Sequence, residues 1–247
     1  MLFRSLPKPN KPDYSLPKSW RPITLFPTVF KIACRVISNT ASRQLMIADQ
    51  MSPAKKGGLS GVSGTTDATF LLRSCIDHHR RHKTSMYVLF MDVANAFVSL
   101  ELGLIEKIIS LTNIDPGIRG WGIASTRGCS IHIKSGRNIS PRIHVTRGVA
   151  QGNTNSALTF NTIKNTVNLW VNHECVGYRL YHTSVPDLSY VDDEALLTDD
   201  FADLQTMIRI HEQWSEYAAL KYDVTKCAFI CEEYWANRIL SDRKSVV

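Results

Sequence analysis

The sequence predicts an α+β fold in which helices pack on one face of an antiparallel sheet. Residues 86–91 form a continuous apolar run that stops at Asp92, which is typical of a buried strand whose carboxylate emerges at its C-terminal end. Two stretches, 130–146 and 188–198, have the composition of hairpins. From residue 86 the predicted order is strand, helix, hairpin, helix, hairpin, helix and strand, which favours the α+β class.

The first 85 residues are predicted to contain an extended segment, two helices and a glycine-rich loop. Residues 6–22 carry five prolines, which favour an extended, loop-like conformation. Apolar residues at helical spacing, with a basic face, predict a helix over 28–47. The glycine-rich loop over 57–64 ends near Thr65, which suits the N-cap of a helix that continues to about His79.

The later elements are predicted from periodicity and from the residues that favour turns. Helices are expected over 97–111, 157–171 and 201–217. Strands are expected over 130–134, 142–146, 178–181 and 227–231. The hairpin over 188–198 places Asp192 and Asp193 at its turn.

Composition excludes several classes of protein. No apolar run approaches the roughly 18 residues of a membrane span. The N-terminus has no usable apolar core for a signal peptide. The six cysteines include no C-x-x-C pair, and no His or Cys cluster suggests zinc, so a reduced, intracellular setting is expected.

The net charge of +7 is unevenly distributed along the chain. Residues 1–91 carry 14 Lys and Arg against 4 Asp and Glu, a net of +10, whereas residues 92–247 carry 15 against 18, a net of −3. A basic first third beside an acidic remainder suggests that one part holds a polyanion while another part does metal chemistry. A merely solvated basic surface is the alternative.

Two acidic pairs lie close together in the sequence and have different explanations. Asp199 and Asp200 directly precede an amphipathic helix, where an N-cap and first-turn acid are favoured by the helix dipole. Asp192 and Asp193 stand instead between two short apolar strands, where adjacent carboxylates repel each other and resist burial. A divalent metal ion would offset that repulsion.

Asp92 supplies a third carboxylate, because the ends of neighbouring strands are expected to meet. Three carboxylates can hold two divalent ions about 3.5–4 Å apart, which activate an attacking hydroxyl and stabilise the leaving oxygen in phosphoryl transfer. Oxygen ligands favour Mg²⁺, with substrate phosphates completing the coordination shell.

Several segments, in order, resemble those of reverse transcriptases over nearly the whole chain. These are LPKPN at 6–10, WRPITL at 20–25, SPAKKGG at 52–58, LFMDVANAFVSL at 89–100, RGVAQGNTNSALTFN at 147–161, YVDD at 190–193 and WSEYAALKYDVTKC at 214–227. The Asn in NAF, where Lys is commoner, is similar to non-LTR (LINE-type) retrotransposons of the site-specific, restriction-like-endonuclease group.

The resemblance implies a right-hand polymerase with fingers at 1–85, a palm at 86–232 and a truncated start of the thumb, or a tail, at 233–247. It implies an RNA template, a DNA primer, deoxynucleoside triphosphates and Mg²⁺, with Mn²⁺ as a substitute. The protein would act in the cytoplasm and nucleus as a ribonucleoprotein. The thumb and the endonuclease of a parent element protein would be missing.

The resemblance also implies roles for the metal-side residues. Asp92, Asp192 and Asp193 would ligate the metal ions, and Lys226 would donate a proton near the pyrophosphate. Tyr190 would pack beneath the primer end. Without the motifs, Lys226 would be an unremarkable lysine at a strand start and Tyr190 a buried hairpin residue.

Further roles are implied on the nucleotide side. Phe97 would lie under the sugar and exclude a 2′-hydroxyl, and Lys8 and Arg21 would contact the triphosphate as charged donors. Gln151 and Gly152 would lie at the nucleotide and the template, where glycine permits close backbone approach. The alternative is that Phe97 is a core residue and that Gln151 and Gly152 form a turn that leads into a helix.

The supporting residues depart from the family's pattern. Ala150 and Ala157 stand where proline is usual, and residues 153–155 replace a turn of small residues. Four further positions carry residues other than those common in the family, namely Lys55, Gly58, Val98 and Asp223. A misplacement of about 1 Å in such a site can lower the rate by on the order of 100-fold. The alternative function is therefore a catalytically silent, decayed fragment that retains RNA or DNA binding.

Overall fold

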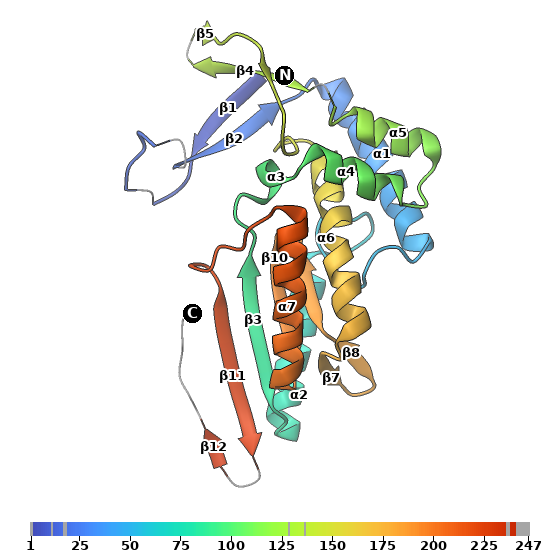
Figure 1. Cartoon of the computed structure of the whole chain (residues 1–247), viewed down its shortest axis with the longest axis vertical. Helices are drawn as coiled ribbons and strands as arrows, with labels where there is room; N and C mark the ends of the chain where they lie inside the picture. Colours follow the sequence, from blue (N-terminus) through green and yellow to red (C-terminus); the bar gives the residue numbers. More distant parts are fainter. Residues whose placement is uncertain are drawn as a thin grey trace. The chain divides into compact units, whose positions relative to one another are not determined.

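The computed structural model describes residues 2–10, 12–16, 19–127, 129–135, 137–235 and 238–240. The chain forms two compact units that are interleaved in sequence: the first unit comprises 1–48 and 97–160, and the second unit 49–96 and 161–247 (Figure 1). Most of the segment 233–247, predicted as a thumb start or tail, lies outside the described residues.

The first unit contains a five-stranded sheet. Its strands are β1 (Leu2–Pro7), β2 (Trp20–Leu25), β4 (Ser130–Ser135), β5 (Asn138–Ile139) and β6 (Ile143–His144), in the order β2-β1-β4-β5 with β6 also paired to β4. The expected loop over 6–22 is therefore wrong at both ends, where strands form. Proline is tolerated there because Pro7 ends β1 and Pro22 lies on an edge strand.

The helices of the first unit are α1 (Thr28–Ile47), α3 (Ala96–Ser99), α4 (Leu102–Ser110) and α5 (Pro116–Ala124). The prediction of α1 is confirmed at both ends. The single helix expected over 97–111 is wrong, because the chain breaks after Ser99, where Glu101 pairs with Arg147. Helix α5 was not predicted, although Asp115 caps it and Pro116 occupies its first turn.

The second unit is built on another five-stranded sheet, ordered β12-β11-β3-β10-β9. Its strands are β3 (Met86–Asp92), β9 (Asp187–Tyr190), β10 (Asp193–Thr198), β11 (Ala228–Trp235) and β12 (Arg238–Leu240). β3 is antiparallel to both β10 and β11. The buried strand over 86–92 and the hairpin over 188–198 are thus confirmed.

Helices cover both faces of this sheet, so the expectation of helices on one face only is wrong (Figure 1). Helix α2 (Thr65–His82) packs its Cys75 with Val88 and Leu197, which are direct partners in the sheet. Glu194 lies three residues before Leu197 in β10, so its side chain points to the opposite face of the sheet. There it contacts α6 (Thr154–Glu174) and α7 (Phe201–Ala218). The uninterrupted apolar run in β3 accounts for burial on both sides.

The remaining elements of the second unit connect this sheet to its helices. Strand β7 (Tyr178–Leu180) was expected, whereas its partner β8 (Thr183–Val185) was not. Gly64, not Thr65, is the N-cap residue of α2. In the described part of the chain we find no helix with both the length and the apolarity needed to cross a membrane.

Candidate active site

Two of the three predicted metal carboxylates lie opposite each other in the second unit. Asp92 ends β3 and Asp193 begins β10, and the two are direct partners in the antiparallel register. Directly opposed residues point to the same face of a sheet, so their carboxylates share one face. Asp192 precedes Asp193 in the tight turn between β9 and β10, where Val191 has a positive φ of 59°.

The electrostatic surroundings of this turn are those of closely spaced negative charges. Burial raises the pKa of Asp192, and the charges of Asp193 and Asp92 raise it further. Lys226 donates a hydrogen bond to Asp92 Oδ2 at 2.5 Å, and its ammonium lies 3.5 Å from Asp223 Oδ2. The hydrogen bond to Asp92 raises the pKa of Lys226. A cationic group therefore already lies at the carboxylate end of β3.

The donor set fits a divalent ion in its chemistry. Asp92, Asp192 and Asp193 offer the hard oxygen ligands that Mg²⁺ prefers. A cation would also relieve the repulsion of Asp192 by the other two carboxylates. Among the residues that the structure describes, no three His, Cys, Asp or Glu side chains are gathered closely enough to hold a metal. The three-carboxylate metal set therefore stays a prediction.

The second acidic pair behaves as the sequence predicted for Asp200. Its side chain accepts a hydrogen bond from the backbone N–H of Ala202 and is the N-cap of α7. Asp199 pairs instead with the exposed Arg179, whose Nε lies 2.9 Å from Asp199 Oδ2. Neither carboxylate belongs to the cluster at the turn.

Tyr190 lies beside the carboxylates and against the glycine-rich loop. A Cβ at Gly57 would lie 2.9 Å from the Tyr190 ring, so a side chain there would displace that ring. A cavity of about 380 Å³ opens between α2 and the sheet, lined by Leu72, Phe90 and Tyr190 and bordered by Asp92 and Asp193. The predicted position of Tyr190 beneath a primer end stays untested.

In the first unit, Phe97 packs against the buried ring of Phe160, with ring centroids 5.5 Å apart. This contact matches the core alternative, although Phe97 remains partly exposed. Arg21 is exposed on β2, and the backbone N–H of Lys8 donates to the carbonyl of Ser19 at 2.9 Å.

Gln151 and Gly152 form the turn that leads into α6. The carbonyl of Gln151 accepts a 2.7 Å hydrogen bond from the backbone N–H of Thr24 on β2. Gly152 has a φ of +108°, and a Cβ there would lie 2.7 Å from the carbonyl oxygen of Thr24. The close approach expected of this glycine is thus made to the protein's own backbone.

We predict that Gly152→Ala lowers the free energy of unfolding by about 2 kcal/mol or more, because alanine resists this φ and its Cβ meets a carbonyl. Gly120→Ala is the matched control, since nothing lies within 4 Å of a Cβ there. In helix α5 that change should stabilise by roughly 0.5–1 kcal/mol. Equal urea midpoints for the two variants would contradict this explanation of Gly152.

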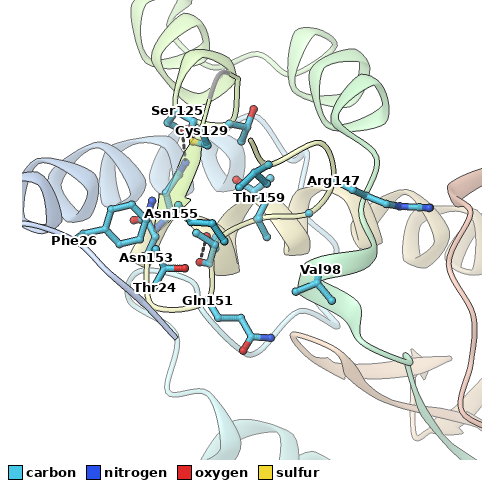
Figure 2. Close-up of a pocket in the computed structure, with 17 residues that line it drawn as sticks. Thr24, Phe26, Val98, Ser125, Cys129, Arg147, Gln151, Asn153, Asn155 and Thr159 are labelled. Atoms are coloured by element: carbon cyan, nitrogen blue, oxygen red, sulfur yellow. Dashed lines mark hydrogen bonds between the residues drawn. The ribbon is translucent and has the colours of Figure 1, made fainter. Parts of the chain in front are cut away.

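A cavity of about 170 Å³ lies in the first unit beside this turn (Figure 2). Its lining includes the carboxamides of Gln151, Asn153 and Asn155, with Phe26 and Val98 on its walls. Asn155 is buried, and its amide contacts Ser125 Oγ at 3.4 Å and Ser38 Oγ at 3.2 Å. Several residues that depart from the family's pattern therefore meet in one hollow.

The predicted site residues fall into two sets. The set in the second unit comprises Asp92, Asp192, Asp193, Tyr190 and Lys226. Within it, Asp92 and Asp193 are opposed in the sheet, and Lys226 donates a hydrogen bond to Asp92. Those in the first unit are Lys8, Arg21, Phe97, Gln151 and Gly152.

Two buried charged residues next to the turn were missed by the sequence reasoning. The side chains of Lys164 and Glu194 are fully buried, and Lys164 Nζ lies 2.8 Å from Glu194 Oε2. The only sequence signal was a row of polar residues at helical spacing in α6, namely Asn161, Lys164, Asn165, Asn168 and Asn172. A polar row normally indicates a solvated face, and here it is largely buried.

Known proteins resemble this chain in sequence and in fold. A family profile described as "Reverse transcriptase (RNA-dependent DNA polymerase)" matches residues 6–244. The chain is 26% identical over 202 residues to a retrovirus-related Pol polyprotein from type-1 retrotransposable element R2 of Popillia japonica, covering 81% of this chain and 28% of that protein. It is 22% identical over 226 residues to the Pol polyprotein from element R2DM of Drosophila melanogaster, covering 92% and 21%.

Among solved structures, telomerase from Candida albicans in complex with a fragment of telomeric RNA is similar in fold. Its TM-score is 0.67 at 11% identity, with 93% of this chain and 41% of that chain covered. The chain thus spans from 21% to 41% of the length of these relatives.

Proposed function

The chain belongs to the reverse transcriptase family, and we propose that it catalyses RNA-templated addition of deoxynucleotides to a primer 3′-hydroxyl. The sequence-based predictions of a non-LTR reverse transcriptase domain and of an α+β polymerase fold are confirmed. The observation that carries the proposal is the opposed pair Asp92 and Asp193 beside Asp192, within a chain that matches the family over 6–244.

Asp92, Asp192 and Asp193 would hold the divalent ions that the family uses, with Mg²⁺ as the proposed ion and Mn²⁺ as a substitute. When bound, such ions lower the pKa of the attacking hydroxyl and stabilise charge on the leaving oxygen. Asp92 and Asp192, with Asp193, would orient the primer end and the α-phosphate. Lys226, within bonding distance of Asp92, would supply the proton that leaves with pyrophosphate.

The residues of the first unit would bind the nucleotide and template. The exposed Arg21 and the nearby Lys8 are proposed to contact the triphosphate. Gln151 and Gly152 would position the nucleotide against the template from the turn before α6. The uneven charge, +10 over residues 1–91, supports binding of a polyanion by the N-terminal part.

We predict that Phe97→Val raises the ratio of ribonucleotide to deoxynucleotide kcat/KM by about 10-fold or more, because a smaller side chain leaves room for a 2′-hydroxyl. A ratio within one preparation does not depend on the fraction of folded protein. Phe70→Ala is the control, since Phe70 is 73% exposed on α2. An unchanged ratio for Phe97→Val would leave Phe97 as a core residue only.

The proposed organisation is fingers at 1–85, palm at 86–232 and a thumb start or tail at 233–247. The proposed partners are an RNA template, a DNA primer and deoxynucleoside triphosphates. We also propose that the chain acts inside the cell, in cytoplasm and nucleus, as a ribonucleoprotein.

Extension of a DNA primer annealed to an RNA template tests the proposal. We expect complementary DNA whose sequence follows the template, and no product when the RNA is removed with ribonuclease beforehand. Products that ignore the template sequence would count against a templated polymerase.

The second candidate function is nucleic-acid binding without catalysis, favoured by the altered residues Val98, Ala150 and Asn153 that line one cavity. It predicts RNA binding that weakens steeply with salt, because phosphate contacts release counterions. It also predicts no nucleotide incorporation at any Mg²⁺ concentration. Incorporation by the intact chain would exclude this alternative.

A further inference from the structure

A buried polar network lies on the α6 side of the catalytic hairpin. Asn168 Nδ2 donates to Glu194 Oε1 at 2.6 Å and also to Asp187 Oδ2. Lys55 Nζ donates to Ser189 Oγ at 2.9 Å. Both strands of the hairpin, β9 and β10, are therefore held through buried polar side chains.

Two basic and two acidic side chains meet in this network. Lys55, Lys164, Asp187 and Glu194 are all buried. Lys164 Nζ lies 2.8 Å from Glu194 Oε2, and the side chains of both residues are fully buried. Burial lowers the pKa of the neighbouring His211 to about 4, so this imidazole is neutral at pH 7. Lys164 and Glu194 thus form a buried salt bridge.

Stability alone does not explain such a pair. Removing two charges from water costs about as much as their attraction returns, and well-packed apolar residues often serve equally well or better. Ala195, Leu196 and Leu197, which follow Glu194 in β10, are buried apolar residues. Unlike an apolar pair, an ion pair fixes the orientation of its two charged groups.

The ammonium group of Lys164 also contacts the turn that carries Asp192. Lys164 Nζ lies 3.4 Å from the carbonyl oxygen of Asp192, in addition to its contact with Glu194. The turn contains Val191 at a φ of 59°, a conformation that a β-branched residue rarely adopts and that surrounding contacts must maintain. Gly57 lies close to the same turn, since a Cβ at this position would lie 3.0 Å from Val191 Cγ2.

We propose that Lys164, fixed by Glu194, is a positioning residue that holds the turn 190–193 in a single geometry through the carbonyl of Asp192. Its consequence for catalysis rests on the proposed polymerase function, whereas its consequence for the turn does not. Lys164 and Glu194 touch no substrate in this role, and they act on the reaction only through Asp192 and Asp193.

The test is amide hydrogen exchange of the full chain carrying Lys164→Met and Glu194→Met together, a change that removes both members of the buried pair. We expect amides of residues 190–193 to exchange at least about 10-fold faster than in the wild type at equal global stability. Amides of α7 should be unchanged. Arg179→Gln with Asp199→Asn, which removes a pair in the same unit whose Arg179 is exposed, is the control and should leave the turn unchanged.

Unchanged exchange at 190–193 in the double variant would overturn the proposal. If that variant unfolds, Lys164→Met with Glu194→Gln gives the same reading, because glutamine keeps an acceptor for Asn168. In primer extension we expect kcat to fall at least about 10-fold with an unchanged KM for the nucleotide. An unchanged kcat would overturn the catalytic part. A wild type that extends no primer would refute the proposed function, while the exchange result still decides the role of Lys164.

Discussion

Replacing Asp192 by Asn is expected to lower the rate of primer extension by at least about 1000-fold. Asparagine has nearly the same shape but lacks the charge that a divalent ion needs from its ligand. Loss of about 4 kcal/mol of transition-state stabilisation, a moderate value for metal-assisted charge neutralisation, corresponds to about that factor. Single-turnover incorporation of one deoxynucleotide measures the effect without interference from product release.

Asp200→Asn is the matched control for this prediction. It is also an acid-to-amide change in an adjacent acidic pair, and asparagine is as good an N-cap as aspartate. We expect wild-type incorporation from Asp200→Asn and an unchanged urea midpoint for both variants. Activity of Asp192→Asn within a few-fold of wild type would remove Asp192 from the metal-binding set.

Lys164→Met alone is expected to lower the free energy of unfolding by about 3–5 kcal/mol, because it leaves the buried carboxyl group of Glu194 without its cationic partner. Adding Glu194→Met should recover most of that loss, since two apolar residues of similar length then fill the same space. Urea unfolding of the single and double variants measures both effects.

The pair of Arg179 and Asp199, in which Arg179 is exposed, provides the comparison. Arg179→Met should cost less than about 1 kcal/mol, because solvent screens the exposed guanidinium. If Lys164→Met were as mild as Arg179→Met, the Lys164–Glu194 contact would contribute nothing to the fold. A double variant no more stable than Lys164→Met would mean that methionine at 194 packs poorly.

Local signals allowed much of the fold to be predicted. Helix α1 was predicted at both ends because apolar residues recur at helical spacing over its full length. Strand β3 was predicted because six apolar residues stop at Asp92. The same run indicates burial on both faces, yet helices were expected on one face only. Helix α5 was missed although Asp115 and Pro116 form a recognisable helix start.

The sequence allowed the acidic turn to be located but not the residues that support it. Asp192 and Asp193 were separated from Asp199 and Asp200 by local context alone, and the capping role of Asp200 is confirmed. The contact between Lys164 and Glu194 joins residues 30 positions apart in α6 and β10, and no local pattern specifies such a partner. The roles of Phe97, Gln151 and Lys226 came from family resemblance and stay predictions.

Single-nucleotide incorporation is the most direct test of the central claim, that this chain is an RNA-templated DNA polymerase. The intact chain is mixed with a DNA primer on an RNA template, one deoxynucleoside triphosphate and Mg²⁺. We predict addition of the nucleotide complementary to the template base, and no addition when EDTA replaces Mg²⁺. A folded chain that binds the primer–template and adds no nucleotide at any Mg²⁺ or Mn²⁺ concentration would contradict the claim.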